Sequence, residues 1–296
     1  GVFDPNYYLA NNHDVAANGL DPVAHFCRHG WKELRNPSPG FDVWWYWASH
    51  LDPASERINP LVHYLVSGMA PRPAKREASP GTATAMPLFA PRRICLFAGY
   101  DPDGRIDDYV VRYVRELSRH ADVYYLADCW MAPEELARLA PFVKGAWAER
   151  HGTYDFGSWS RLATTHVGWE AISGYDELLL VNDSCYLVRP LDHVFAKMDA
   201  TACDWWGLQA TKGIAATRSV SSNRFPHRIP MEEVLRDWLP CYESDYTYDF
   251  LIGSYFLAFR KPAASDPVFR KLLSRVVQQR GKKLIIQKYE IGMTRL

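Results

Sequence analysis

Acidic side chains follow three short apolar runs of the chain. They are Asp101 and Asp103 after the run 94–98, Asp128 after the run 123–126, and Asp183 after the run 178–181. If these runs are parallel strands, their carboxyl ends meet at one edge of a sheet, where ligands of such sheets bind. Asp128 would then accept hydrogen bonds from a nucleoside, and Asp183 would hold a divalent cation against a diphosphate. In the alternative interpretation, Asp101 and Asp103 shape a turn and Asp183 caps a neighbouring segment.

The segment Tyr154–Trp159 is a second candidate for binding phosphate. It comes just before a predicted helix, whose N-terminal amides and dipole attract anions. Gly157 would let a phosphate approach closely, with Asp155 and Ser158 beside it. The alternative is that Asp155 and Ser158 only cap the helix. The predicted binding edge for a nucleotide-activated donor consists of Asp155, Gly157 and Ser158, the acidic positions named above, and their neighbours Tyr100 and Asn182.

Two further carboxylates are candidates for a general base. Glu290 lies in residues 282–296, a predicted helix with many apolar side chains, and burial there would raise its pKa. Asp249, in a tyrosine-rich stretch, is the rival base. The segment Thr211–Arg228 contains Lys212 and is interpreted either as a loop that closes over phosphates or as a solvated surface loop.

Strands and helices alternate along the part of the chain that carries these residues. The apolar runs 94–98, 123–126 and 178–181 are predicted strands, and 108–117, 134–139, 158–172 and 191–198 are predicted helices. This alternation predicts an α/β domain with a mostly parallel, Rossmann-like sheet and flanking helices. Such a sheet would bring the acidic segments to one edge.

The first 70 residues contain an internal repeat. Phe3-Asp4-x-x-Tyr7-Tyr8 returns as Phe41-Asp42-x-x-Trp45-Tyr46, and Asp21-Pro22-Val23-Ala24-His25 returns as Asn59-Pro60-Leu61-Val62-His63, both shifted by 38 positions. Each copy predicts two short helices with an acidic or amide N-cap. Gly30 and Gly68 are expected at helix C-termini in a left-handed conformation. His25 and His63 are interpreted as packing residues and not as a metal pair.

The predicted organisation is therefore two helical repeats in residues 1–70, a linker in 71–92 and an α/β domain in 93–296. The linker is poor in periodic hydrophobicity and rich in Pro, Ala, Thr and Arg. Because the sequence stops abruptly, we expect it to be a piece of a larger protein.

Composition narrows the classes of partner. Lys plus Arg and Asp plus Glu are equal at 34 each, so no net charge attracts nucleic acid. The 11 Trp and 17 Tyr favour flat, amphipathic ligands such as sugars and nucleobases, although most of these rings are expected in the core. The six cysteines form no Cys-x-x-Cys pair, and no apolar run is long enough to span a bilayer. A cytoplasmic location is expected, with peripheral association at the inner face of the membrane as a compatible variant.

The segment Tyr175–Phe195, with Asn182-Asp183-Ser184 at its centre, resembles the metal-motif segment of GT-A fold glycosyltransferases. More closely, residues 93–296 resemble the rhamnan synthesis protein F family. The similar stretches are Tyr100–Tyr109, Tyr154–Trp159, Asn182–Ser184, Asp204–Leu208 and Tyr289–Gly292. The N-terminal repeats resemble modules attached to bacterial polysaccharide glycosyltransferases, which implies that the chain is part of a larger multidomain transferase.

The resemblance implies an inverting glycosyltransferase with a GT-A-like fold. It would move rhamnose, or another hexose or deoxyhexose, from a nucleotide-sugar to a surface polysaccharide, lipopolysaccharide or lipid-linked glycan. Asp183 would be a catalytic and metal-binding residue, with Mn²⁺ or Mg²⁺ as the cation. Asn182-Asp183-Ser184 has only one carboxylate where metal-dependent relatives have two, so metal dependence stays open.

A non-enzymatic class stays open as well. The single carboxylate at Asp183, and the apolar stretch Leu251–Gly253 where relatives carry His and Gln, would also suit a catalytically degenerate glycan-binding or assembly module.

Overall fold

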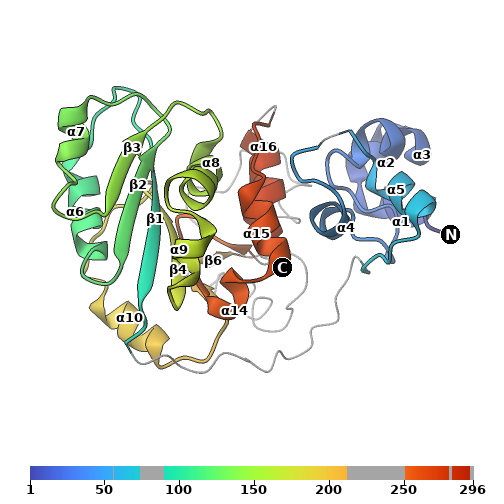
Figure 1. Cartoon of the computed structure of the whole chain (residues 1–296). Coiled ribbons are helices and arrows are strands. Elements are labelled where there is room, and N and C mark those ends of the chain that lie inside the picture. Colours follow the sequence, from blue (N-terminus) through green and yellow to red (C-terminus); the bar gives the residue numbers. More distant parts are fainter. Residues whose placement is uncertain (56, 74–89, 212–250, 280–281, 294–296) are drawn as a thin grey trace, which may run out of the picture. The chain divides into compact units, whose positions relative to one another are not determined.

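The computed structural model describes residues 1–55, 57–73, 90–211, 251–279 and 282–293 (Figure 1). These residues fall into two compact units. One contains the N-terminal residues up to 73 together with residues 286–293, and the other contains residues 90–209 and the described residues between 252 and 285. Most of the predicted linker 71–92 lies outside the described residues, and the division at residue 70 stays a prediction.

The first unit is helical. Its elements are α1 (Pro5–Asn11), α2 (His13–Ala17), α3 (Pro22–His25), the π-helix η1 (Phe26–Gly30), α4 (Val43–His50), α5 (Pro60–Ser67), the π-helix η4 (Ile286–Glu290) and α17 (Ile291–Met293). The side chains of Asp4 and Asp42 each accept a hydrogen bond from a backbone N–H three residues on, at 3.0 Å. These are the predicted N-caps.

Matching contacts occur in the two halves of the N-terminal helical region. The Tyr8 hydroxyl lies 2.9 Å from His25 Nδ1, and the Tyr46 hydroxyl lies 2.9 Å from His63 Nδ1. Both histidines therefore pack against a tyrosine, as expected. Gly68 ends α5 with φ +67°, the predicted left-handed cap.

The same prediction is wrong for Gly30. This residue ends a π-helix without a positive φ, and a Cβ at this position would collide with the Tyr8 hydroxyl. Close packing against the tyrosine ring, and not backbone conformation, is the reason for glycine here.

The second unit is an α/β domain. In the described residues its sheet has the strand order β3-β2-β1-β4-β8-β5. The strands are β1 (Arg93–Gly99), β2 (Asp122–Ala127), β3 (Gly145–Ala148), β4 (Glu177–Asn182), β5 (Trp205–Gly207) and β8 (Phe256–Arg260). β3, β2, β1 and β4 are parallel, whereas β8 runs antiparallel to both β4 and β5. The predicted fold class, a mostly parallel sheet with flanking helices and an N-terminal helical region, is confirmed.

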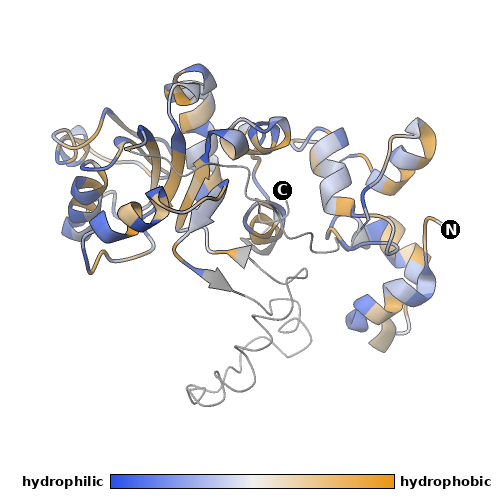
Figure 2. Ribbon diagram, turned by 90° about the horizontal axis from the view of Figure 1, so that it is seen from below, coloured by the Kyte–Doolittle hydropathy of each residue, from blue (hydrophilic) through white to orange (hydrophobic). Residues whose placement is uncertain are grey.

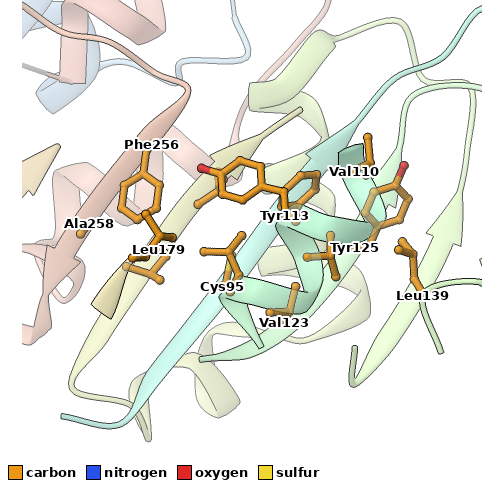
Figure 3. Packing of buried hydrophobic residues seen from close by; sticks show 14 of the residues in the cluster. Cys95, Val110, Tyr113, Val123, Tyr125, Leu139, Leu179, Phe256 and Ala258 are labelled. Carbon is orange, nitrogen blue, oxygen red and sulfur yellow. The ribbon is translucent and has the colours of Figure 1, made fainter. Parts of the chain in front are cut away.

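Helices cover both faces of this sheet (Figure 1). On one side lie α6 (Asp108–Leu117), α7 (Pro133–Ala137) and α10 (Asp192–Asp199), and on the other α8 (Tyr154–Arg161), the π-helix η2 (Leu162–His166), α9 (Trp169–Ser173), α14 (Lys261–Ala264) and α15 (Pro267–Ser274). Alternate residues of the strands face the two layers, so Cys95 and Leu179 pack with Tyr113 of α6 (Figure 3). The central strands are apolar along most of their length (Figure 2), as buried parallel strands require.

Short elements complete the described chain. They are β6 (Ala210–Thr211) paired with β7 (Leu251–Ile252), and α16 (Lys282–Ile285), which leads into η4. In the described residues no helix is both long and apolar enough to cross a bilayer.

Two sequence expectations about local structure need correction. The helix predicted from Ser158 to Ile172 begins at Tyr154 and is interrupted at Gly168, whose φ is +86°. Ser158 is consequently inside the helix and cannot be its N-cap. The strand β3, at the edge of the sheet, was not predicted because its four residues give too short an apolar pattern.

Candidate functional site

The acidic segments leave neighbouring strands at the same edge of the sheet. In the strand register Gly99 of β1 lies opposite Ala127 of β2, and Ala98 lies opposite Asn182 of β4. The backbone N–H of Asp128 donates to the Gly99 carbonyl at 2.9 Å. The backbone N–H of Tyr100 donates to Asp183 Oδ2 at 2.7 Å. The structure thus brings the segments of Asp101, Asp128 and Asp183 together.

Among the carboxylates at this edge, Asp183 has the most clearly shifted pKa. Burial raises its pKa to about 6, and the neighbouring Asp155 and Asp101 carboxylates act in the same direction. The Tyr100 N–H opposes this shift because it stabilises the charged form. In the described part of the chain no Lys or Arg forms an ion pair with Asp183. Its charge is therefore held mainly by backbone N–H groups.

Asn182 links β4 to the start of α8. Its Nδ2 donates to Asp155 Oδ2 at 2.7 Å, and its Oδ1 accepts from the Ser184 N–H at 3.0 Å. The side chain is buried and uses its amide and its carbonyl. Asn182 therefore fixes the turn around Asp183 and holds the Asp155 carboxylate at this edge.

Asp101 shapes the turn after β1. Its Oδ1 accepts from the N–H groups of Asp103 and Arg105, at 2.9 and 3.0 Å. Gly104 has φ +69°, and a Cβ there would collide with the Trp130 carbonyl. The turn interpretation of Asp101 is thus seen in the structure, and its carboxylate also helps to raise the pKa of Asp183.

Asp128 holds the segment that leads into α8. Its Oδ1 accepts from the N–H groups of His151 and Gly152, at 2.8 and 2.7 Å, and its Oδ2 accepts from the Tyr154 N–H at 3.1 Å. The three donors occupy much of the hydrogen-bonding capacity of a carboxylate. Nucleoside binding by Asp128 stays a prediction that must compete with these contacts.

His151 is a residue of the candidate site that the sequence analysis did not identify. Its Nδ1 lies 3.3 Å from Asp128 Oδ2 and 2.6 Å from Thr153 Oγ1, and its Nε2 lies 3.0 Å from Ser158 Oγ. Burial lowers its pKa, which favours the neutral ring. The only signal in the sequence is a histidine beside Gly152, close to the Tyr154–Trp159 motif.

The three residues predicted to bind phosphate differ in burial and in position. Ser158 is fully buried and bonded to His151, and Gly157 is packed tightly against Thr153. Asp155, in contrast, is partly exposed and reaches Asn182. Of the three residues, the structure brings Asp155 to the Asp183 end of the sheet.

The structure does not place the remaining predicted residues relative to this edge. Lys212 and Asp249 lie outside the described residues. Glu290 belongs to η4 in the first unit, where the adjoining Lys288 carbonyl accepts a hydrogen bond from Trp44 Nε1 at 2.7 Å. The role of Glu290 or Asp249 as base stays a prediction.

Asp183 could hold a divalent cation only with help from a substrate. Mg²⁺ commonly binds through one or two carboxylates plus phosphate oxygens, so the donor set at Asp183 and Asp155 fits such a shared site. In the described residues a group of three potential ligand side chains within 4.8 Å occurs elsewhere, at Glu116, His120 and Asp192. There Arg119 already pairs with both carboxylates, so that cluster has its own cation.

Comparison with known proteins identifies the family. No curated protein matches the chain. The family model described as rhamnan synthesis protein F matches residues 123–296, which is more than half of the chain and includes Asp128, Asp155 and Asp183. The chain belongs to the rhamnan synthesis protein F family.

Proposed function

We propose that the chain is a glycosyltransferase that moves a sugar from a nucleotide donor to a growing polysaccharide. Membership of a rhamnan synthesis family supports a role in polysaccharide synthesis and makes rhamnose the first sugar to test. The observation that carries the catalytic part of the proposal is Asp183, a partly buried carboxylate at the carboxyl edge of a parallel sheet with a pKa raised to about 6. Such perturbed groups concentrate at functional sites.

In this proposal the nucleotide-sugar diphosphate lies at the ends of β1 and β4. Asp183 is held by the Tyr100 N–H, and Asp155 is held by Asn182, so both carboxylates keep fixed positions before a substrate arrives. A bound Mn²⁺ or Mg²⁺ would supply positive charge to the departing diphosphate. Because two carboxylates would repel that diphosphate without a cation, we expect turnover to depend on the metal.

The reaction itself is a displacement at the anomeric carbon. A base removes the proton of an acceptor hydroxyl, the oxygen attacks the anomeric carbon, and the bond to the nucleoside diphosphate breaks with inversion. Glu290 and Asp249 are the proposed bases. A base must lie within hydrogen-bond reach of the acceptor hydroxyl, or one water away, in the complex.

The proposal is tested with the whole chain and a panel of nucleotide-activated sugars that includes activated rhamnose. Donor hydrolysis and transfer to a rhamnan oligosaccharide are measured with Mn²⁺, with Mg²⁺ and with a chelator, for wild type and Asp183→Ala. The matched control is Asp192→Ala, which removes an exposed carboxylate from the amino-terminal turn of α10. We expect turnover in wild type and in the control, and its loss in Asp183→Ala.

A folded wild-type protein that turns over none of these donors, and whose melting temperature is unchanged by nucleoside diphosphates, contradicts the proposal. Binding of glycan without turnover would favour the degenerate glycan-binding module instead. A shift in melting temperature is informative because a ligand that binds the native state stabilises it.

A further inference from the structure

The exposed aromatic rings of the described chain gather at one place in the fold. The residues Tyr100, Trp130, Tyr154 and Tyr186 are 59%, 72%, 46% and 72% exposed. Among the residues whose burial the structure describes, all other Phe, Tyr and Trp side chains are buried or half-buried. Tyr100 follows β1, Trp130 follows β2, Tyr186 follows β4, and Tyr154 begins α8 after β3. We call these four residues the aromatic edge.

Two of these residues are held through their backbone by the acidic side chains, and a third is held through its ring. The Tyr100 N–H donates to Asp183, and the Tyr154 N–H donates to Asp128. The Tyr186 ring lies 4.4 Å from the Tyr109 ring, whose hydroxyl donates to the Asp183 carbonyl at 3.1 Å. The rings are thus presented from ordered segments beside carboxylates.

The Trp130 segment is fixed in another way. The backbone of Trp130 packs against Gly104, where a side chain would collide with the Trp130 carbonyl. Glycine at this position therefore lets the turn after β1 lie directly against the segment that carries the exposed indole. The loops after β1 and β2 form one packed surface.

Four large exposed rings at one sheet edge indicate a ligand-binding surface. Aromatic side chains stabilise a fold mainly by burial, and exposed apolar groups that gather on one surface commonly mark binding sites. Flat rings interleaved with carboxylates match the two sides of a sugar, since C–H groups lie on its faces and hydroxyls at its rim. Ligand sites typically combine apolar walls with a few fixed polar groups in this way.

We propose that the aromatic edge binds the polysaccharide acceptor, with successive sugar rings stacked on Trp130 and Tyr186; this proposal rests on the proposed function. A glycan chain is favoured over one nucleobase because the rings leave three neighbouring strands. With about 4.8 Å between strands, the ends of β2, β1 and β4 spread over roughly 10 Å. One base cannot cover segments so far apart, whereas a chain of sugars can.

Calorimetric titrations test the proposal with three probes: a rhamnan oligosaccharide, monomeric rhamnose, and uridine or thymidine diphosphate. The variants are Trp130→Ala, Trp130→Phe and Tyr186→Ala. Val188→Ala is the matched control, because Val188 is an exposed apolar side chain close to Tyr186 but has no ring. Melting temperatures establish that each variant is folded.

We expect the oligosaccharide to bind wild type more tightly than monomeric rhamnose does. Trp130→Ala and Tyr186→Ala should each weaken oligosaccharide binding by at least about tenfold, the usual cost of removing a central aromatic anchor. Trp130→Phe should restore most of the affinity, and Val188→Ala should keep it. Nucleoside diphosphate binding should be unchanged in all four variants.

Several results would overturn the aromatic edge as an acceptor site. The first two are a wild type that does not bind the oligosaccharide and ring variants that bind it as tightly as wild type does. The others are an equal loss of oligosaccharide affinity in Val188→Ala, and ring variants that lose affinity for the nucleoside diphosphate alone. The fate of the proposed function is read separately. Oligosaccharide binding that depends on the rings, without sugar transfer from any donor, would retain the aromatic edge and remove the transferase. If sugar is transferred and the ring variants leave the KM for the acceptor unchanged, the transferase is retained and the aromatic edge is removed as its acceptor site.

Discussion

The two ends of the same sheet carry carboxylates in opposite electrostatic settings. At the amino end of β4, Glu177 is almost completely buried, and its Oε2 accepts from Arg93 Nε at 2.7 Å. Its Oε1 accepts from Trp206 Nε1 at 2.8 Å and lies 3.6 Å from Arg260 Nε. Arg93 also pairs with Asp199 at the end of α10. Each buried charge at this end has an opposite charge beside it.

At the carboxyl end of β4 the compensation is different. Asp183 is stabilised by the Tyr100 N–H, and within the described chain no Lys or Arg pairs with it. Its neighbours Asp155 and Asp101 are acidic and raise its pKa further. Negative charge is therefore concentrated at this end, and the described residues supply no cation to Asp183.

The difference separates two uses of a buried carboxylate. A paired carboxylate such as Glu177 has its charge satisfied and ties β1, β4 and β8 together, and removing one partner leaves the others uncompensated. An uncompensated carboxylate such as Asp183 costs stability and is retained where an incoming ligand supplies the missing charge. We therefore expect substitutions at the two ends to have opposite consequences.

The largest effect is expected for Glu177→Gln. The substitution keeps the shape of the side chain but leaves Arg93 and Arg260 without their shared anion, so the free energy of unfolding should fall by about 3–5 kcal/mol. Urea unfolding followed by circular dichroism measures the change. Asp192→Asn is the control, because its pair with Arg119 is exposed and its loss should alter stability little. Unchanged stability in Glu177→Gln would contradict the claim that the ion pairs of Glu177 stabilise the fold.

Asp183→Asn should affect activity and not folding. We expect turnover of the nucleotide-sugar donor to fall by about 10²–10³-fold, as when a group that stabilises charge in the transition state is removed. The free energy of unfolding at neutral pH should stay the same or rise, because a costly buried charge is gone. Steady-state kinetics and urea unfolding of the same preparation measure both quantities. A variant that is unfolded, or fully active, would contradict the role given to Asp183.

The pH dependence of stability gives a third test of the same contrast. The pKa of Asp183 is about 6 in the folded protein, above its value of about 3.9 in an unfolded chain. Its contribution to stability is consequently full below about pH 4 and is lost as the pH rises through about 6. The stability of wild type relative to Asp183→Asn should fall by about 2 kcal/mol between pH 4 and pH 7.

Asp192 supplies the control of opposite sign. Its hydrogen bonds with Arg119 lower its pKa, so its contribution is present at neutral pH and is lost as the pH falls. The stability of wild type relative to Asp192→Asn should therefore rise with pH. Equal pH dependence for the two variants would show that the setting of Asp183 is not unusual.

The strands β1, β2 and β4 and the order of the acidic segments could be predicted from the sequence, because apolar runs such as 94–98 and 178–181 are local signals. Their meeting at one edge follows from parallel pairing. The antiparallel insertion of β8 beside β4 could not be predicted, since no local pattern specifies which strand Phe256–Arg260 pairs with. For the same reason the Arg93–Glu177 pair, 84 residues apart, has no signature in the sequence.

For the acidic segments the sequence predicted the shared sheet edge, but it did not predict the contacts that their side chains make there. Ser158 was expected to cap a helix because caps are usually local. The carboxylate that receives the N–H groups at the start of α8 is instead that of Asp128, 26 residues before Tyr154. A remote side chain can replace a local cap only when the sheet brings it there, so the assignment needs the tertiary structure.

The smallest effect, and the sharpest test within the carboxyl edge, is expected for Asp128→Asn. The amide oxygen can keep the His151 and Gly152 N–H groups, but the NH₂ group cannot accept from Tyr154. We expect the free energy of unfolding to fall by about 2 kcal/mol, the usual contribution of a hydrogen bond to a charged group. Amide hydrogen exchange should become faster in residues 151–154, while nucleoside diphosphate affinity changes little. If stability and exchange stay at wild-type values and only nucleoside affinity falls, then Asp128 binds the donor as the sequence suggested. In that case its contacts with the 151–154 backbone add nothing to the fold, and Asp128 belongs with Asp183 as a residue maintained for its ligand.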